Sequence, residues 1–363
     1  MNENYKKLLV KDKTGSVTGY CSIPWREILI NSKGQLFNCG CEGKVTKDIG
    51  NILDIETAEQ FKEMFWTNDF KKSILDGSYR YCKANICPFL QKSILEGKDE
   101  NFYNLQSKLS LEKDFIIYLP VDRSCNLKCA SCRHETLIYK NNEETNRIQK
   151  IIDKLNTVIL PSLKHKQVVI RLDGSGELFA SHTLLPWFLN FNFEEYSNVK
   201  FWIHTNATLI SRYEDFLIKN AKNIFGFEVS IDAASKEVYE ATRRNASWED
   251  LLSGLETIDK VCDVIKTNNM HMRLAYSFTI SSSNYKDINP FVDFSLTYKK
   301  AKYVVFYQIQ DWGHHKGTQW DDLNIFNSKH PLHYALLEQV KNFDFNNRKV
   351  QSNLLYLKPK DFG

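Results

Sequence analysis

The chain lacks any hydrophobic run long enough to cross a membrane. Its 363 residues contain no apolar stretch close to the roughly 20 residues that a transmembrane helix requires. Residues 1–13 are polar and of mixed charge, without the apolar core of a secretion signal. These absences predict a cytoplasmic protein without a membrane partner.

A strong excess of one charge is also missing. With 48 Lys and Arg against 44 Asp and Glu, the formal charge is +4, and like charges are not gathered into blocks. This argues against non-specific nucleic-acid binding, although it leaves room for a local basic pocket. The hydrophobic content of 42% and the charged content of 25% are typical of a globular protein.

Cysteine is the residue type that stands out. Without an export signal disulfides are not expected, and clustered cysteines more often bind metal or carry out chemistry. Cys262, in a helical context, is predicted to be a small packed side chain. The other cysteines precede residue 133: Cys21, Cys39, Cys41, Cys82, Cys87, Cys125, Cys129 and Cys132.

A β-hairpin is predicted near the N-terminus. Residues 27–30 have a strand pattern, residues 31–34 form a turn, and residues 35–39 form the returning arm. Cys21 and Cys39 flank this hairpin and are expected near each other at its open end.

A helix and a second pair of cysteines follow the hairpin. Thr57 begins the helix, because Gln60 three residues later completes a capping box. Cys82 and Cys87 lie on a loop that Pro88 closes. Together with the two cysteines that flank the hairpin, they make a plausible cage for a metal centre.

The rest of the chain alternates between strand and helix patterns. This alternation predicts parallel βα units in right-handed succession, with chemistry on the loops at the carboxyl ends of the strands. Helix starts are predicted at Ser211 and Ser247. The expected fold is α/β, a partial (β/α)6 barrel of parallel strands with a small N-terminal cysteine-rich α+β module. The candidate strands are 115–121, 168–172, 199–204, 224–231, 273–280 and 303–309.

The predicted parts are the cysteine-rich module, a linker, the barrel and a C-terminal helical extension that packs on the barrel. Their boundaries are 1–92, 93–114, 115–312 and 313–363. In the extension, Pro331 precedes a helical pattern that includes Leu336 and Val340. His314 and His315 are expected to be exposed to solvent, because adjacent histidines point in different directions and rarely share a metal.

A CxxxCxxC run, residues 125–132, follows the first barrel strand. Structural zinc sites offer four ligands and a closed shell, whereas three local thiolates would leave one iron of a 4Fe–4S cluster without a protein ligand. Such an open iron is a site for a cofactor to coordinate. In this run and its position, the chain resembles the radical S-adenosylmethionine superfamily.

The resemblance implies a cluster held by Cys125, Cys129 and Cys132, whose open iron takes the amino and carboxylate groups of S-adenosylmethionine. One electron then cleaves the sulfonium to methionine and a 5′-deoxyadenosyl radical, which takes a hydrogen atom from the substrate. A zinc site or a thiol cluster without function is the alternative. Ser131 departs from the pattern, because many relatives carry an aromatic there that packs on adenine.

Two further stretches resemble superfamily motifs in order and position. Residues 173–177, Asp-Gly-Ser-Gly-Glu, resemble the GGE motif that holds the methionyl amino group. An ordinary glycine turn is the alternative, and the position after the second predicted strand adds weight to the motif. Residues 204–208 resemble the TNG-type segment, with Ala207 in place of the usual glycine.

The end of the fourth predicted strand also carries a resemblance. Ser230 and Asp232 resemble the SxD segment near the ribose and methionyl groups, with a helix-capping turn as the alternative. Arg243 stands where relatives carry an arginine that can pair with a carboxylate. The cofactor contacts implied by all these motifs are Gly174, Ser175, Gly176, Glu177, Asn206, Ser230, Asp232 and Arg243.

The N-terminal module resembles the SPASM/twitch auxiliary-cluster modules of the same superfamily. The matching features are the spacing of Cys21, Gly34 and Cys39 and the nearby Gly50-Asn51 pair. The resemblance implies a second 4Fe–4S cluster, with a four-cysteine zinc site as the alternative. In most relatives this module follows the barrel, whereas here it precedes it. The implied ligands are Cys21, Cys39, Cys82 and Cys87, with Cys41 as the alternative to Cys39.

These features predict a radical enzyme in which the second, fully ligated cluster passes electrons. Related auxiliary-cluster enzymes modify ribosomal peptides or small metabolites such as sugars. Peptide modification is slightly favoured over dehydrogenation or epimerisation of a small metabolite. The expected partners are the substrate and an electron donor such as flavodoxin or ferredoxin. A non-catalytic iron–sulfur or zinc protein for binding or electron transfer is the second hypothesis.

The substrate itself is not predicted, and no catalytic acid or base is named. Several polar and aromatic side chains are candidates to line the barrel, with the phase of each strand open by one residue. They are Tyr118, Arg171, Trp202, His204, Tyr276 and Tyr307.

Overall fold

The chain forms two compact units. The first comprises Met1–Asp122, Lys140–Ser175 and Pro186–Phe201, and the second comprises Arg123–Tyr139, Gly176–Leu185 and Trp202–Gly363. The computed structural model describes residues 19–40, 42–84, 87, 90, 96–97, 114–172, 176–267, 272–297, 301–311, 313, 315, 318–341, 343–344 and 347–352.

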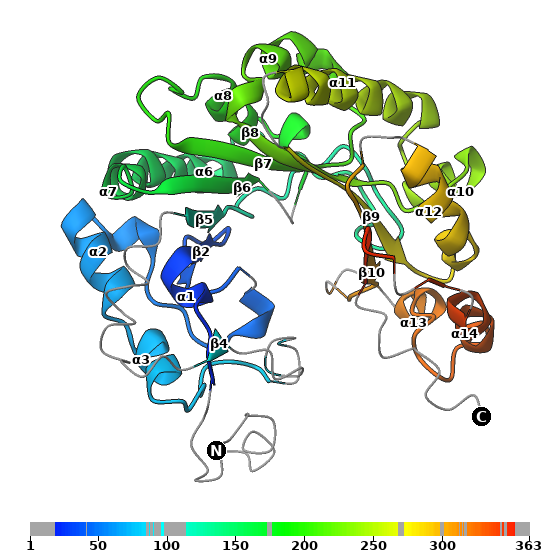
Figure 1. The fold of residues 1–363 in the computed structure, drawn as a ribbon, viewed down its shortest axis with the longest axis horizontal. Helices are drawn as coiled ribbons and strands as arrows, with labels where there is room; N and C mark the ends of the chain where they lie inside the picture. Colours follow the sequence, from blue (N-terminus) through cyan, green and yellow to red (C-terminus); the bar gives the residue numbers. More distant parts are fainter. Residues whose placement is uncertain are drawn as a thin grey trace. The chain divides into compact units, whose positions relative to one another are not determined.

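A nine-stranded sheet has the strand order β11-β10-β9-β8-β7-β6-β5-β2-β3 (Figure 1). Strand β2 pairs with β3 in antiparallel fashion. The parallel pairs are β2 with β5, β5 with β6, β8 with β9, β9 with β10 and β10 with β11. The sheet is open, ending at β11 and β3, which confirms the predicted α/β class and partial parallel barrel. The strands are β2 Glu27–Ile30, β3 Leu36–Phe37, β5 Asp114–Tyr118, β6 Gln167–Leu172, β7 Val199–Thr205, β8 Ile224–Ser230, β9 Arg273–Ile280, β10 Tyr303–Gln308 and β11 Val350–Ser352.

The remaining regular elements are mostly helices that follow the strands. The helices are α1 Ile23–Arg26, α2 Ala58–Trp66, α3 Asp69–Leu75, α6 Glu143–Lys154, α7 Leu160–Ser162, α8 Leu184–Leu189, α9 Glu214–Lys219, α10 Lys236–Thr242, α11 Trp248–Thr267, α12 Ile288–Thr297, α13 Gln319–Leu323 and α14 His333–Lys341. A two-stranded ladder joins β1 Gly19–Tyr20 to β4 Glu96–Gly97. The predicted linker lies largely outside the described residues, and the predicted part boundaries stay predictions.

The predicted hairpin of the first unit is confirmed. Leu29 and Ile30 of β2 pair with Phe37 and Leu36 of β3. Gly34 takes a φ of +80° in the turn, the left-handed region that glycine enters without steric cost. Because β2 also pairs with β5, the hairpin continues the sheet that carries the barrel strands.

The second unit has a clear division between the two faces of its strands. Phe278 of β9 and Phe306 of β10 both pack against Phe291 of α12, the first tilted and the second edge to face, at ring distances of 4.9 and 5.9 Å. Figure 1 shows α9, α11 and α12 along the outer face of these strands. Since side chains alternate along a strand, Tyr276 lies on the helix side with Phe278. The expectation that Tyr276 lines the barrel is therefore wrong, whereas Tyr307 lies on the opposite face.

Three predicted helix starts have different outcomes. Thr57 and Gln60 form the predicted capping box of α2. Ser247 accepts a hydrogen bond from the Asp250 amide at 3.1 Å and caps α11 as predicted. The start predicted at Ser211 is wrong, because Ser211 lies within the 3-10 turn Ile210–Tyr213 and α9 begins after it without a side-chain cap.

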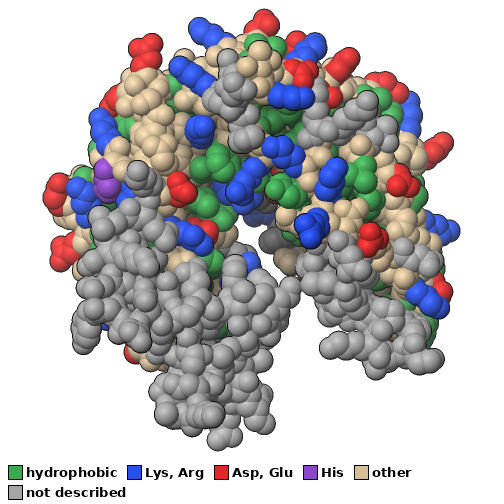
Figure 2. All heavy atoms as spheres, in the orientation of Figure 1, with side chains coloured by type: hydrophobic (Ala, Val, Ile, Leu, Met, Phe, Trp, Pro, Cys, Tyr) green, Lys and Arg blue, Asp and Glu red, His purple; other side chains and the backbone are tan. Residues whose placement is uncertain are grey.

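The outer surface over α9 and α11 carries both signs of charge. Figure 2 shows Lys and Arg side chains interspersed with Asp and Glu over these helices. In the part of the chain that the structure describes, no helix has the length and apolar character needed to span a membrane.

Candidate functional site

The three-cysteine loop leaves the carboxyl end of β5 and folds back on itself. The Cys125 amide donates to the Leu137 carbonyl at 2.6 Å, and the Leu137 amide returns a bond to Cys125 at 3.2 Å. The amides of Cys132 and Arg133 both donate to the Cys129 carbonyl at 3.0 Å. These local bonds turn the chain so that the run 125–132 forms one compact loop.

The segment 242–245, which begins at the last residue of α10, holds one side of this loop. It connects to the loop through backbone and side-chain groups, so the loop conformation does not depend on a metal alone. The bonds run from Lys128 N to Arg244 O (3.0 Å), from Arg244 Nε to Lys128 O (3.1 Å), from Ala130 N to Thr242 O (3.2 Å) and from Asn245 Nδ2 to Asn126 O (2.8 Å).

Each of the three sulfur atoms faces a hydrogen-bond donor. The donors are Leu127 N and Asn206 Nδ2 at Cys125 (3.5 and 3.9 Å), Arg243 Nη1 at Cys129 (3.8 Å) and Arg133 Nε at Cys132 (3.5 Å). Donors and guanidinium groups stabilise thiolate over thiol, and thiolate is the form that ligates metal. The chemistry of this donor set therefore fits an iron–sulfur cluster held by three cysteines.

Burial opposes the ionisation of Cys125 and Cys129 in the metal-free chain. It raises the pKa of Cys125 to about 12, with the Glu177 charge as the next cause. Burial also raises the pKa of Cys129, against the lowering effect of Arg243. A bound metal removes the thiol proton outright, so cluster assembly and deprotonation are coupled at this loop.

No set of three or more His, Cys, Asp or Glu side chains is gathered around one ion-sized position within the described residues. Tetrahedral zinc with Zn–S bonds of about 2.3 Å would bring its sulfur ligands to about 4 Å from one another. A preformed single-ion site is thus absent from the part of the chain that is described.

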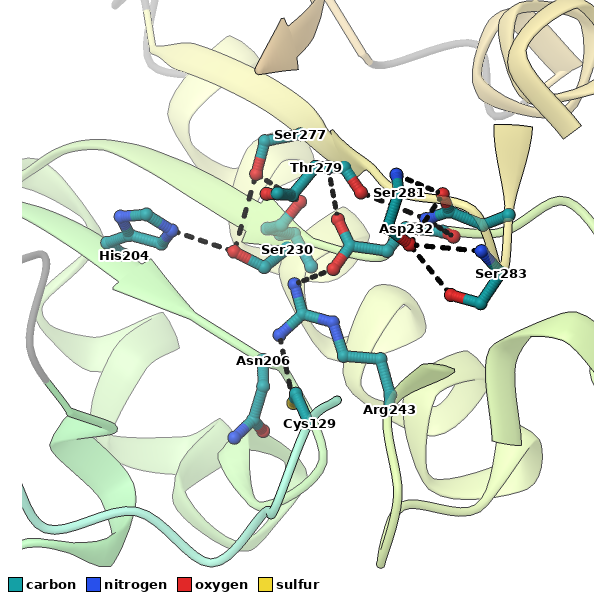
Figure 3. A network of polar contacts seen from close by, with 12 residues as sticks. Cys129, His204, Asn206, Ser230, Asp232, Arg243, Ser277, Thr279, Ser281 and Ser283 are labelled. Atoms are coloured by element: carbon teal, nitrogen blue, oxygen red, sulfur yellow. Dashed lines mark hydrogen bonds and ion pairs between the residues drawn. The ribbon is translucent and has the colours of Figure 1, made fainter. Parts of the chain in front are cut away.

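Asp232 and Arg243 form a buried ion pair beside Cys129. The Arg243 Nη2 atom lies 2.8 Å from Asp232 Oδ2, and the Asp232 side chain is 3% exposed. Figure 3 shows the Arg243 guanidinium between Asp232 and Cys129. The second carboxylate oxygen of Asp232 accepts the Thr279 amide at 2.6 Å. The carboxylate that Arg243 meets within the described chain is therefore Asp232.

The Asp232 backbone is unusual, and the two charges of the pair shift each other's pKa values. Asp232 has a φ of +64°, which is uncommon for a residue with a side chain. Burial raises the pKa of Asp232, with Arg243 opposing the shift. Burial alone would lower the pKa of Arg243, but Asp232 and Cys129 raise it above its ordinary value. The guanidinium therefore keeps its charge next to the sulfur.

Glu177 lies beneath the loop and is 2% exposed. Its carboxylate accepts the Asn206 amide at 2.6 Å, the Phe179 amide at 3.1 Å and the Thr205 hydroxyl at 2.9 Å. Its own amide donates to the Ser124 carbonyl at 2.7 Å. Burial raises the pKa of Glu177, and these hydrogen bonds oppose that shift. Glu177 thus ties the end of β7 to the start of the cysteine loop.

The other residues of the predicted glycine motif are placed only in part. Gly176 is exposed, whereas Gly174 and Ser175 lie outside the described residues. Their predicted contact with the methionyl amino group stays a prediction, as does that of Glu177.

Asn206 connects the segment after β7 with the cysteine loop. Its side-chain nitrogen donates to Asn126 Oδ1 at 3.0 Å, and Asn126 in turn donates to Thr208 Oγ1 at 2.9 Å. Ala207 has a φ of +62°, so the backbone keeps the conformation of the glycine that the motif usually has there. Gly254 of α11 packs so closely that a Cβ atom on it would overlap the Ala207 carbonyl.

Polar side chains continue along the barrel face of the strands. His204 Nε2 lies 2.8 Å from Ser230 Oγ, which lies 3.3 Å from Ser277 Oγ (Figure 3). Tyr307 donates to Glu228 Oε1 at 2.9 Å and is 39% exposed. Ser277 and Glu228 are not among the predicted site residues, although Glu228 lies two residues before Ser230 and so shares its face.

The expectation that His315 is exposed is wrong. Its side chain is 2% exposed and contacts the cysteine loop at the Ala130 carbonyl, 3.2 Å away. Its neighbour His314 lies outside the described residues.

In the first unit, four cysteines converge on one apolar core. The core residues include Trp25, Leu29, Phe37, Val45, Phe70, Ile74 and Tyr79, and the cysteines packed against them are Cys21, Cys39, Cys82 and Cys87. The pKa of Cys21 is raised to about 12, mainly by burial, with the charges of Cys39 and Cys87 as further causes. Burial also raises the pKa of Cys82, with Cys21 and the other two as further causes. The thiols are thus close enough to interact, while Cys41 lies outside the described residues.

The Gly50-Asn51 pair has a structural role beside this core. The Leu36 amide donates to the Gly50 carbonyl at 2.9 Å, and Asn51 Nδ2 donates to the Lys33 carbonyl at 3.0 Å. Hydrogen bonds of this pair therefore hold the segment around Gly50 and Asn51 against the β2–β3 hairpin.

No family model and no curated protein matches the chain. Solved structures with similarity include Streptococcus suis SuiB bound to S-adenosylmethionine, at 15% identity and a TM-score of 0.39, covering 92% of this chain and 72% of that one. TYW1 with a lysine-pyruvate adduct is similar at 16% identity and a TM-score of 0.34, covering 64% and 72%. The radical S-adenosylmethionine methyltransferase TsrM from Kitasatospora setae is similar at 12% identity and a TM-score of 0.35, covering 51% and 32%. Similarities of this size do not establish a common fold.

Proposed function

We propose that the chain is a radical S-adenosylmethionine enzyme with a 4Fe–4S cluster at Cys125, Cys129 and Cys132. The observation that carries the proposal is the compact three-cysteine loop at the carboxyl end of a parallel strand, with a hydrogen-bond donor at each sulfur. Three thiolates leave one iron without a protein ligand, which suits a cofactor that coordinates iron. When bound, the cluster supplies the electron that cleaves S-adenosylmethionine to methionine and a 5′-deoxyadenosyl radical.

The described residues around the loop would hold this centre in place. Arg243 donates to Cys129 and Asn206 to Cys125, and hydrogen bonds to cluster sulfurs tune the potential of such centres. Glu177 is occupied with protein groups, so we propose that it acts by fixing the loop geometry. Gly174, Ser175, Gly176, Ser230 and Asp232 remain the other proposed cofactor contacts.

We also propose a second cluster in the first unit, as in SPASM/twitch modules, with Cys21, Cys39, Cys82 and Cys87 as ligands. Its support is the convergence of four thiols on one apolar core. Four thiolates would complete the cluster, so these residues would serve electron transfer rather than cofactor binding. Such a site suits an oxidoreductase that removes an electron from a substrate radical.

For the substrate we propose a peptide in preference to a sugar or other small metabolite, with flavodoxin or ferredoxin as the electron donor. This choice rests on the motif resemblance alone. The barrel face offers His204, Ser230 and Tyr307 as polar groups for such a substrate.

Anaerobic reconstitution with iron and sulfide tests both proposals on the full chain. About eight iron atoms per chain are expected for two clusters, and about four with one zinc would mean that the first unit holds zinc. Addition of S-adenosylmethionine and a strong reductant should release 5′-deoxyadenosine. Fully loaded protein that releases none would instead be a non-catalytic iron–sulfur protein.

The variant Cys125→Ala/Cys129→Ala/Cys132→Ala provides the site-specific test. It should lose about four irons and all cleavage of S-adenosylmethionine while keeping the other cluster. Cys262→Ala on helix α11 is the matched control, because it removes a thiol outside both sets. Cleavage that survives in the triple variant would show that the site is elsewhere.

A further inference from the structure

His315 reaches the three-cysteine loop from the part of the chain that follows β10. Its Nε2 atom lies 3.2 Å from the carbonyl oxygen of Ala130, between Cys129 and Cys132. Its Nδ1 atom lies 3.4 Å from Asp311 Oδ1. The imidazole thus contacts the three-cysteine loop with one ring nitrogen and the Asp311 carboxylate, which follows β10, with the other.

Two other rings enclose the imidazole. His134 packs edge to face at a ring distance of 5.9 Å, and Trp320 of α13 lies at 5.6 Å. With only 2% of its surface exposed, the His315 side chain has lost water as a competing partner. A hydrogen bond in such a setting stabilises the conformation of the loop, because its loss would leave a buried polar group without a partner.

The contact completes a two-sided attachment of the loop. The amide of Ala130 donates to the Thr242 carbonyl on one side, and its carbonyl faces His315 on the other. The same peptide segment lies between two of the three cysteines, so its orientation sets where the sulfur atoms of Cys129 and Cys132 point.

We propose that His315 is a positioning residue that latches the three-cysteine loop in its cluster-binding conformation before and after cluster assembly. This inference rests on the proposed function, because the latch is assigned to the cluster that the loop would hold. The ring nitrogen Nε2 carries the hydrogen in this role and donates it to the Ala130 carbonyl.

Two substitutions separate the hydrogen bond from ring packing. His315→Phe keeps a flat ring between His134 and Trp320 and cannot donate. His315→Gln removes the ring and keeps an N–H donor for the Ala130 carbonyl. His330→Phe is the matched control, because His330 also bonds through both ring nitrogens, to Asp322 O and Leu332 N, but away from the loop.

Hydrogen exchange of the full, metal-free chain tests the latch without any cluster. In His315→Phe, the amides of Ala130, Cys132 and Arg133 should exchange about fivefold faster than in wild type, as expected for the loss of one hydrogen bond. His315→Gln should stay close to wild type, and His330→Phe should not change these amides. Unchanged exchange in His315→Phe would overturn the proposal.

The second readout is retention of iron. On the reconstituted chain, the cluster whose paramagnetic resonance signal responds to S-adenosylmethionine should be lost to a chelator about fivefold faster in His315→Phe than in wild type. Faster exchange with unchanged iron loss would show that the contact does not serve the cluster, and would overturn the proposal. A wild-type chain that takes up no iron at these cysteines would overturn the proposed function. Because this result concerns the wild-type chain only, it is distinct from a failure of the proposed His315 role.

Discussion

The two cysteine sets of this chain are assembled in different ways. The set at 125–132 is contiguous in sequence, and backbone hydrogen bonds to the segment 242–245 hold it from outside. The set in the first unit comes from positions 21 to 87 and converges only because an apolar core brings those segments together. The first set is therefore a local motif supported by polar contacts, while the second is a product of the fold.

The polar surroundings differ in the same sense. In the second unit each sulfur of the loop faces a donor, and a buried ion pair stands beside Cys129. In the first unit the core against which the cysteines pack is aromatic and aliphatic. Burial is the main cause of the raised thiol pKa values in both sets. This contrast suits one centre that binds a cofactor and one that is closed off from it.

Removal of the central aromatic side chain of the first unit should break its cysteine set selectively. Trp25 is 1% exposed in that core, so Trp25→Ala should cost about 3–5 kcal/mol of unfolding free energy. Iron bound by the first unit should fall, while the three-cysteine loop keeps its share. Urea unfolding and iron analysis are the measurements.

A matched variant removes a core aromatic from the second unit instead. Phe278 is fully buried, and Phe278→Ala should cost a similar free energy while sparing the iron of the first unit. Equal iron losses in both variants would mean that the two sets do not depend on separate cores.

The ion pair beside Cys129 should matter almost as much to stability. Asp232→Asn leaves the Arg243 charge buried without its carboxylate, and this should cost about 3 kcal/mol. Adding Arg243→Met should restore part of the loss, because no unpaired charge then remains. A double-mutant cycle from urea unfolding measures the coupling. Additive losses would contradict the pairing.

The buried lysine of the first unit gives a pH-dependent prediction. Lys71 Nζ donates to the Phe65 carbonyl at 2.6 Å, and burial together with the nearby Lys166 lowers its pKa well below 10.5. Between the lowered pKa and 10.5 the unfolded chain binds the proton and the folded chain does not. Wild type should therefore gain stability with rising pH, by up to about 1.4 kcal/mol per pH unit relative to Lys71→Met.

Urea midpoints at about pH 8 and about pH 9.5 measure this difference. The exposed neighbour Lys72 is the control, and Lys72→Met should follow wild type at both values. If Lys71→Met and wild type run parallel, Lys71 does not deprotonate on folding in this range.

The smallest change in unfolding free energy is expected in the segment that follows β7 and contacts the three-cysteine loop. Ala207→Gly should stabilise the fold by about 0.5–1 kcal/mol, because it relieves a left-handed backbone at the cost of a more flexible unfolded chain. Ala233 is also buried but has no positive φ, so Ala233→Gly should destabilise. A stabilised Ala233→Gly would show that the gain is unrelated to the strained φ.

Features encoded in short stretches of sequence could be predicted. The alternation of strands and helices, the hairpin and the Thr57 capping box depend on neighbours a few residues apart, and the structure confirms them. The three-cysteine loop also follows a strand as predicted. Ala207 was flagged as a departure from glycine, and its positive φ shows that the backbone tolerates the substitution.

Contacts between distant segments could not be predicted. The Glu177 carboxylate accepts the Asn206 amide after β7, a partner that no local pattern reveals. The predicted exposure of His315 follows from the adjacent histidine only, whereas the burial of its side chain depends on the path of the chain after β10. The error at Tyr276 has a different cause, because a phase shift of one residue exchanges the two faces of a strand.

The role of the three-cysteine loop is tested by the release of 5′-deoxyadenosine from Cys129→Ala and from Cys82→Ala, each reconstituted and reduced. Cys129 belongs to the loop set and Cys82 to the set of the first unit. No 5′-deoxyadenosine is expected from Cys129→Ala, and continued release is expected from Cys82→Ala. Release from Cys129→Ala at the wild-type rate would contradict the assignment of the loop as the cofactor-binding centre.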